Sequence, residues 1–260
     1  MITKLTEQQE AKFPEYVKAW TAKGLTTEQR TPADATRDFS EFQRLVLQKK
    51  KIAPVVVLKS PMECWVAVQM VKGLFGESQV ESQVRSQVWP QVQSQVQSQV
   101  LSQVSSQVWS QVLAGVLEQV SSQVSSQVRS QVRSQVESQV KDFVWPYFDC
   151  QFWAGWFSFY EFVRNELGVT FADDDKYQAL KACVGYGMVF PLDELCIVCQ
   201  PPTQIHKNAS GLHNENGPAV SYGGENEIYA LNGVVMRKDY VMTPEHKILS
   251  ETIMRLTRSV

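Results

Sequence analysis

The sequence has few of the residues and motifs that identify a reaction or a cellular destination. It contains three histidines and five cysteines in 260 residues. It has no nucleophile elbow, no phosphate-binding glycine loop and no HExxH motif. It has no apolar run long enough to span a membrane, and its first residues, MITKLTEQQE, are not typical of a signal peptide. These absences exclude the enzyme classes that need such motifs.

The sequence also lacks a large excess of positive or negative charge. The net charge is −2, which gives no overall attraction to nucleic acid or to a membrane surface. The cysteines are scattered and odd in number, so we expect reduced thiols in a cytoplasmic protein. We also expect no cofactor, no bound metal and no membrane partner.

The sequence is rich in one tetrapeptide, Ser-Gln-Val-x, which repeats from Ser78 to Val144. Valine recurs at every fourth position from Val80 to Val144. In an α-helix, a row with this spacing drifts by about 40° per repeat. Serine and valine are poor interior helix formers, and Pro90 and Gly115 add further cost. These observations argue against one continuous helix.

A β-solenoid suits the spacing better, because a period of four contains the strand period of two. Valine and serine would point inward, and glutamine and x would point outward, in about four to six stacked coils. We therefore predict a β-solenoid, with helical tetrapeptides as the alternative. A disordered Ser/Gln-rich linker is a third possibility, but a linker has no reason to keep the valine register.

The repeat divides the chain into four segments. They are a helical cap with one strand (1–76), the repeat block (77–144), an aromatic-rich helical cap (145–190), and an antiparallel β module with a C-terminal segment (191–260). The predicted fold class is α+β: a short tetrapeptide-repeat β-solenoid capped by helices, with a C-terminal antiparallel β-hairpin module.

The N-terminal segment shows helical spacing. Apolar residues from Phe13 to Trp20 share one face of a helix that Gly24 ends, and Thr31-Pro32 begins a second helix. The basic triplet 49–51 predicts a solvated helix end, with a phosphate or nucleic-acid contact as the alternative. APVVVL predicts a buried strand. Ser60-Pro61 opens a helix with an apolar face that should pack on this strand, made of Met62, Trp65, Val66 and Met70.

The segments after the repeat are aromatic and then strand-like. WAGWFSFYEFVRNELGV predicts a largely buried helix, with a ligand-stacking patch as the alternative. Three acidic residues, 173–175, suit the start of a shorter helix. LCIVCQ and the following short runs predict strands, with turns at Asn216-Gly217 and Asn232-Gly233.

This combination resembles an uncharacterised family, a domain of unknown function with Trp-Asp-Ser-Val or Gly-Ala-Ser-Val tetrapeptide arrays. The landmarks are PVVVLKSP, the array itself, the WAGWFSFYEFVRNELGV helix and the tail from TQIHKNASGLHNENGPAVSY to YALNGV. The tail is also similar to hairpin repeats related to MORN modules. This chain carries Gln where Ser often precedes Val. The resemblance implies the layout and no reaction.

Two sets of residues could carry chemistry. Cys196 and Cys199 with His206 and His213 are residue types that bind zinc. Positions i and i+3 of a strand face opposite sides, however, so we expect inert strand cysteines. His213 and Glu215 could form an acid/base pair, or they could brace a hairpin. We assign no catalytic residue and no metal ligand.

We therefore expect a non-enzymatic interaction or scaffold protein. The repeat block would present variable side chains to a protein partner or to a second copy. The candidate partner-binding residues are Trp89, Leu101, Trp109, Leu113 and Leu117. Flanking helices covering this face would be the alternative. Charges in the block cancel, so a nucleic-acid partner is not expected.

Two further readings stay open. One is an enzyme or a small-molecule-binding protein with a site where the tail meets the aromatic helix, made of His206, His213, Glu215, Trp153 and Trp156. The other is a module associated with defence or mobile elements.

Overall fold

The computed structural model describes residues 1–76, 89–124, 128, 130–139, 148–149, 151, 153–224 and 227–243. For residues 89–95, 135–139 and 148–149 it describes the backbone alone. The chain forms two compact units, Met1–Pro201 and Pro202–Val260. The boundary lies after the point at which the sequence analysis began the C-terminal module, residue 191. Strand β4 (Cys196–Cys199) belongs to the first unit because it pairs there with β1 (Val55–Leu58).

The described part of the protein is a mixture of helices and small sheets, so the α+β class is confirmed. Besides β1 and β4, unit 1 contains α1 (Glu7–Glu10), α2 (Phe13–Gly24), α3 (Pro32–Glu41), η1 (Phe42–Val46), α4 (Pro61–Phe75), α6 (Trp89–Gln103), α7 (Ser106–Val112), η3 (Leu113–Leu117), α8 (Glu118–Val124), α9 (Ser130–Gln139), β2 (Phe148–Asp149), α10 (Trp153–Leu167), α11 (Asp174–Ala182) and β3 (Met188–Pro191). No helix in the part of the chain that the structure describes is long and apolar enough to cross a membrane.

The N-terminal helices are confirmed. Helix α2 ends at Gly24, and Trp20 is buried on its inner face. Thr31 caps α3 by accepting the backbone N–H of Asp34 at 3.1 Å.

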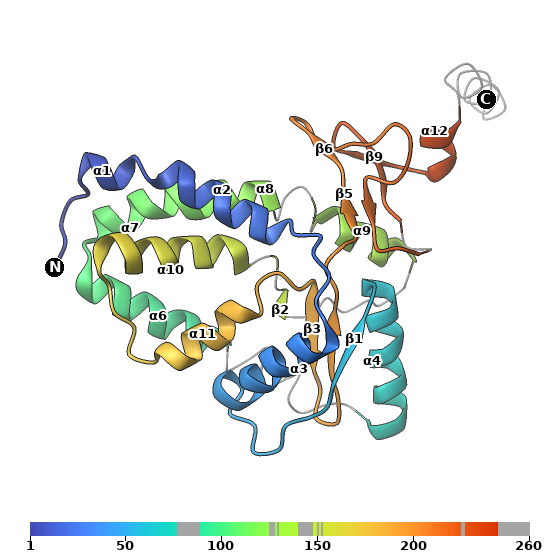
Figure 1. Cartoon of the computed structure of the whole chain (residues 1–260), viewed down its shortest axis with the longest axis horizontal. Helices are drawn as coiled ribbons and strands as arrows, with labels where there is room; N and C mark the ends of the chain where they lie inside the picture. Colours follow the sequence, from blue (N-terminus) through green and yellow to red (C-terminus); the bar gives the residue numbers. More distant parts are fainter. Residues whose placement is uncertain are drawn as a thin grey trace, which may run out of the picture. The chain divides into compact units, whose positions relative to one another are not determined.

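The described part of the repeat block is helical, and the predicted β-solenoid is wrong for these residues. Helices α6, α7, α8 and α9 and the π-helical turn η3 take up almost all of residues 89–139 that are described (Figure 1). The alternative of helical tetrapeptides holds there. Residues 77–88, 125–127, 129 and 140–144 of the block lie outside the described residues.

The valines of these helices stay on one buried face because interruptions of the α-helix correct the rotation that accumulates with each four-residue repeat. Helix α6 ends at Gln103, Val104 bridges to Ile2, and Ser105 caps α7. The next reset is η3, where the backbone N–H of Glu118 bonds to the carbonyl of Leu113, five residues back. A π turn contains more residues than an α turn, so it rotates the row back. The result is a continuous buried row, made of Val100, Val104, Val108, Val112, Val116, Val120 and Val124.

The two residues that argued most strongly against a helix have a place in it. Pro90 lies in the first turn of α6, where no helical N–H bond is lost. Gly115 lies against the ring of Phe13: a Cβ at this position would be 2.6 Å from Phe13 Cδ2. Glycine is needed there for a close approach between helices.

The part of the valine row in η3 and α8 packs against both α2 and α10. Both helices contact η3 and α8, and their aromatic rings meet, as in the 4.9 Å contact between Phe13 and Phe162. The aromatic helix is largely buried, as predicted, and its rings fill the centre of unit 1. Repeats and aromatic helix therefore form one core.

A small sheet completes unit 1. Its strand order is β1-β4-β3-β2, with β1 parallel to β4 and β3 antiparallel to both neighbours. Helix α3 contacts β1, and α4 contacts β1, β3 and β4. The two helices lie on either side of these strands in Figure 1. Strand β1 confirms that APVVVL contains a strand, but the predicted burial is wrong. Its four residues are half-buried or exposed, because β1 lies at the edge of the described sheet.

Unit 2 consists of short antiparallel ladders. They pair β5 (Gln204–Ile205) with β8 (Val220–Ser221), β6 (Lys207–Asn208) with β7 (Gly211–Leu212), and β9 (Tyr229–Leu231) with β10 (Val234–Met236), before α12 (Lys238–Met242). The predicted turn at Asn232-Gly233 is confirmed, because both residues have positive φ, 49° and 81°.

Candidate functional site

Helix α4 is apolar on two faces and buries only one. Cys64 and Val68 form the buried face. On the other face, Val66, Met70 and Leu74 follow at intervals of four, with 44%, 63% and 75% of their surface exposed. Phe75, the residue after Leu74, is also exposed. The expectation that Val66 and Met70 pack on the strand is therefore wrong. A helix that is apolar all round does not reveal from its pattern which face it buries.

This helix is held firmly at both ends. Ser60 Oγ accepts the N–H of Glu63 at 3.2 Å, and Glu63 Oε2 accepts the N–H of Lys59 at 2.8 Å. Pro61 occupies the first helical position. Gly76, with φ of 86°, ends the helix and donates its N–H to the carbonyl of Lys72. The exposed row therefore stands on a well-defined helix.

Strand β1 lies at the edge of the sheet, next to α4. Its residues pair with β4 on one side, and in the sheet as described the other side has no strand. Val55 and Val57 pack on the core, whereas Val56 is 36% exposed. An apolar edge strand with unpaired backbone groups is a template for another strand. We call the exposed residues Val56, Val66, Met70, Leu74 and Phe75 the α4 surface.

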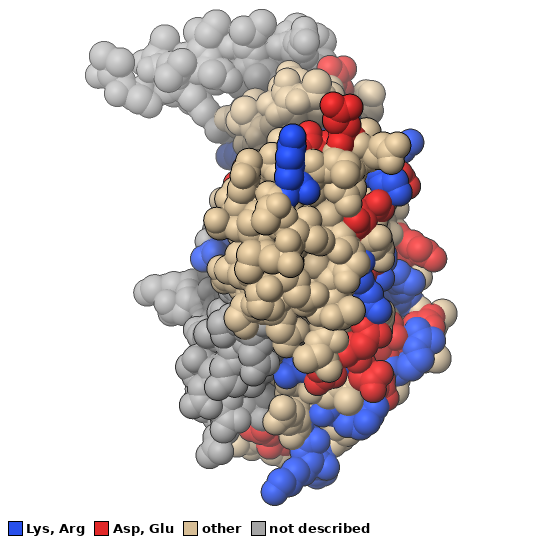
Figure 2. All heavy atoms as spheres, turned by 90° about the vertical axis from the view of Figure 1, so that its left-hand side faces the viewer, with Lys and Arg blue, Asp and Glu red and all other residues tan. Residues whose placement is uncertain are grey.

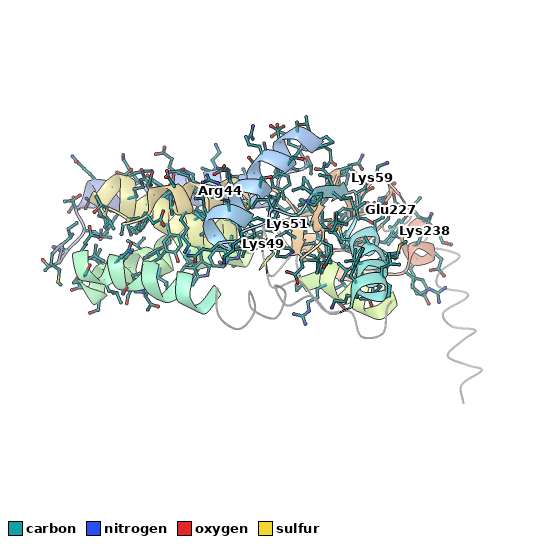
Figure 3. The ribbon with its side chains drawn as sticks, turned by 90° about the horizontal axis from the view of Figure 1, so that it is seen from below. Arg44, Lys49, Lys51, Lys59, Glu227 and Lys238 are labelled. Carbon is teal, nitrogen blue, oxygen red and sulfur yellow. The ribbon has the colours of Figure 1, made fainter. Side chains whose placement is uncertain are left out.

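The basic triplet does not provide three free cations. Lys49 Nζ donates to the carbonyl of Leu192 at 2.5 Å, and burial lowers the pKa of its amine. Lys50 and Lys51 are exposed. Figure 3 labels Lys49, Lys51 and the neighbouring Arg44 on this segment. Lys50 and Lys51 are solvated as predicted, but they lie in the loop after η1, which ends at Val46, and not at a helix end. Lys49 has a structural partner.

Most of the predicted partner-binding residues lie against the core of unit 1. Leu117 is only 9% exposed, so its predicted outward placement is wrong. Trp109 packs on Phe159 with ring centroids 4.5 Å apart, and Leu113 also packs on the core. Leu101 is half-buried. Trp89 begins α6, but its side chain is outside the described residues. The alternative, a face covered by flanking helices, describes Trp109, Leu113 and Leu117.

The repeat helices present serine to solvent instead. At the described positions two residues after a buried valine of these helices, the side chain is exposed, as at Ser102, Ser106 and Ser110. From α6 to α8 the chain carries a single charged residue, Glu118. Figure 2 shows a broad area of unit 1 without charged side chains beside a charged area. This uncharged surface offers hydroxyl groups and no distinct recognition element.

The candidate polar site of the tail braces a hairpin. His213 Nδ1 accepts the backbone N–H of Asn232 at 3.2 Å, and His213 Nε2 lies 3.5 Å from Glu215 Oε1. His206 is exposed and bonds through its backbone to Ala219 and to His213. These contacts agree with the alternative in which His213 and Glu215 brace a hairpin and do not act as an acid/base pair.

The alternative hypothesis of an enzyme or small-molecule site also included Trp153 and Trp156. These tryptophans lie in unit 1, whereas the histidines lie in unit 2. Trp153 is buried and Trp156 is half-buried, stacked on Tyr160 at 5.8 Å. The two tryptophans therefore pack within unit 1, and the two histidines form their hydrogen bonds within unit 2.

The remaining candidates are structural in the part of the protein that is described. Cys196 and Cys199 are fully buried thiols in β4, and burial raises the pKa of Cys196 to about 12. Asp173 caps α11 by accepting the N–H of Lys176 at 3.0 Å, as the acidic run predicted. Among the described residues, no three His, Cys, Asp or Glu side chains gather as metal ligands.

The comparisons with known proteins give no information about the α4 surface. No protein-family model matches the chain, and no curated protein and no solved structure matches it either.

Proposed function

We propose that this protein is a non-enzymatic scaffold that associates with a second copy of itself through the α4 surface. The observation that carries the proposal is the exposed row of Val66, Met70 and Leu74 on a capped helix. Monomeric proteins rarely leave a contiguous apolar patch of this kind open to water. Covering it would remove apolar area from solvent at about 25 cal/mol per Å².

A second copy fits this row because the row is symmetric about Met70. In an antiparallel pair related by a two-fold axis, Met70 meets Met70, and Val66 meets Leu74 of the other copy. In the same register Ala67 faces Gly73. A Cβ at Gly73 would have no atom within 4 Å, so the second helix has room to approach closely there.

Strand β1 and the charge balance also support self-association. The open edge of β1, with the sequence VVVL, can pair with the same edge of a second copy. A net charge of −2 gives little repulsion between copies. A single pair of four-turn helices lies at the low end of stable interface areas. The dimer should therefore form with a dissociation constant on the order of micromolar.

Sedimentation velocity over a wide concentration range tests this proposal. We expect the wild-type chain to shift from monomer to dimer, and Met70→Glu and Leu74→Glu to remain monomeric. Ser106→Glu, which adds the same charge at an exposed position of α7, should behave as wild type. A wild-type chain that stays monomeric throughout would contradict the proposal. So would a different protein that binds the α4 surface and is lost in Met70→Glu.

A cytoplasmic location belongs to the same proposal. Its support is that Cys64, Cys183 and Cys196 are buried thiols that form no disulfide, as is usual in a reducing compartment. The resemblance to the tetrapeptide-array family remains a prediction.

A further inference from the structure

Four aromatic side chains of α10, α11 and the loop between them form a closed circuit. The neighbouring ring centroids are 5.9 Å apart for Phe157 and Tyr160, and 6.1 Å for Tyr160 and Phe171. They are 4.8 Å apart for Phe171 and Tyr177, and 5.3 Å for Tyr177 and Phe157. Each ring thus touches two others around a common centre.

A small cavity of about 50 Å³ lies at these rings. Val96 and Gln99 of α6 close one side, and Asp173 and Lys176 also line it. Phe157, Tyr160 and Tyr177 are at most 5% exposed, whereas Phe171 is only half-buried. The walls are therefore apolar and mostly fixed, and Phe171 is the most exposed of the four rings.

One hydroxyl in these walls makes no hydrogen bond to the described residues. Tyr160 is 4% exposed, and among the described residues its hydroxyl makes no hydrogen bond, while burial raises its pKa. The hydroxyl of Tyr177 differs, because it donates to Glu161 Oε1 at 2.6 Å. The Tyr160 hydroxyl can therefore donate to or accept from a polar atom of a ligand that reaches these rings.

The charges around the cavity favour an uncharged ligand. The Arg164 guanidinium lies 5.3 Å from the centre of the Tyr177 ring, and Lys176 is a further cation at the lining. A cationic ligand would meet both. An anion would lose its hydration among apolar walls, with Asp173 nearby. A neutral ring with one polar atom has neither cost.

The size of the cavity adds one requirement. An apolar cavity that takes up benzene has a volume of about 150 Å³, which is larger than the cavity here. A one-ring ligand therefore fits only in the place of the Phe171 ring, against Tyr160 and Tyr177. The loop that carries Phe171 can hold its backbone meanwhile, because Gln99 and Gln103 of α6 bond to Ala172 and Thr170.

We infer that this cavity is a binding site for a small uncharged aromatic molecule that hydrogen-bonds to Tyr160 and replaces the ring of Phe171. Phenol and toluene are the probes, because they share a ring and differ by the hydroxyl. Titrations of the full chain followed by calorimetry or NMR would compare wild type with two variants, Phe171→Ala and Tyr160→Phe.

The expected results are specific to each side chain. Phe171→Ala should bind phenol at least tenfold more tightly than wild type, since no ring competes for the site. Wild type should prefer phenol over toluene by about five- to tenfold, the size of one hydrogen bond. Tyr160→Phe should lose that preference. Val234→Ala, which trims an exposed apolar side chain of β10, should change neither value.

Two outcomes would overturn the inference. One is the absence of saturable phenol binding in both wild type and a Phe171→Ala variant whose circular dichroism is native. The other is a Tyr160→Phe variant that keeps the preference for phenol, which would show that the hydroxyl does not contact the ligand.

Discussion

The side chain of Gln103 bonds both backbone groups of Thr170. Its Nε2 donates to the Thr170 carbonyl at 2.9 Å, and its Oε1 accepts the Thr170 N–H at 3.1 Å. Two glutamines outside the repeats do the same for one residue each, Gln43 for Ala53 and Gln200 for Arg30. Gln103 belongs to the repeat block, so the glutamine of a repeat can fasten a distant loop while the neighbouring valine fills the core.

This bond pair predicts a difference between two glutamines one repeat apart. Gln103→Ala should lower the free energy of unfolding by about 1–2 kcal/mol, because two hydrogen bonds to Thr170 are lost. Gln107→Ala, at an exposed position without such a bond, should change it by less than about 0.5 kcal/mol. Chemical denaturation measures both. Equal effects would show that Gln103 does not hold the loop.

Replacing a helical glycine with alanine usually stabilises a protein, and the packing of Gly115 predicts the opposite result at this position. Gly115→Ala should destabilise the protein by about 1–3 kcal/mol, because its Cβ would lie 2.6 Å from the Phe13 ring. The matched variant is Gly73→Ala in α4, where the new Cβ meets nothing. It should stabilise the protein by about 0.5–1 kcal/mol through helix propensity. Thermal melts at low concentration compare the two, and a stabilising Gly115→Ala would contradict the helical packing of the repeats.

Lys23 predicts a dependence of stability on alkaline pH. Burial lowers the pKa of its amine below the usual 10.5, and the charge of Lys181 adds to this effect. Between the lowered pKa and 10.5, the unfolded chain binds more protons than the folded chain, so stability rises with pH. The wild type should therefore gain stability relative to Lys23→Met as pH rises towards 10.5. Lys18→Met, at an exposed position of α2, serves as the control, and melts from neutral to alkaline pH would show a constant difference if the idea is wrong.

The buried tyrosines predict the opposite trend at higher pH. Burial raises the pKa of Tyr16 to about 12 and also raises those of Tyr160, Tyr177 and Tyr186. Their contribution to stability is complete below pH of about 10, where unfolded tyrosine is still protonated. It is lost as pH rises from there. Tyrosinate absorbance should therefore appear in two stages, the second coinciding with unfolding. All eight tyrosines ionising near pH of about 10 in a folded chain would exclude this.

Local signals in the sequence predicted much of the secondary structure. Thr31-Pro32 and Ser60-Pro61 begin helices, and Asn232-Gly233 forms a turn with two positive φ angles. Each of these depends on neighbouring residues and on backbone sterics alone, so the chain far away does not alter the outcome.

The repeat block and the α4 surface were not predictable in the same way. A valine at every fourth residue keeps to one face of a strand. In a helix it keeps to one face only if the rotation of the valine row around the helix is corrected. The resets depend on Ile2 pairing with Val104 and on the π turn at 113–117, which are tertiary features. The exposed row of α4 was missed because its two faces are equally apolar. A signal was present in the near absence of charge from PMECWVAVQMVKGLF, which exceeds what a one-sided helix needs.

Cross-linking at Met70 tests the central claim, self-association through α4, most directly. In the proposed dimer Met70 lies opposite Met70 of the second copy, so Met70→Cys should form a disulfide-linked dimer under mild oxidation. Wild type should not, and neither should Ser106→Cys, an exposed control on α7. A Met70→Cys chain that remains monomeric on a non-reducing gel, at concentrations where the wild type sediments as a dimer, would contradict the α4 interface.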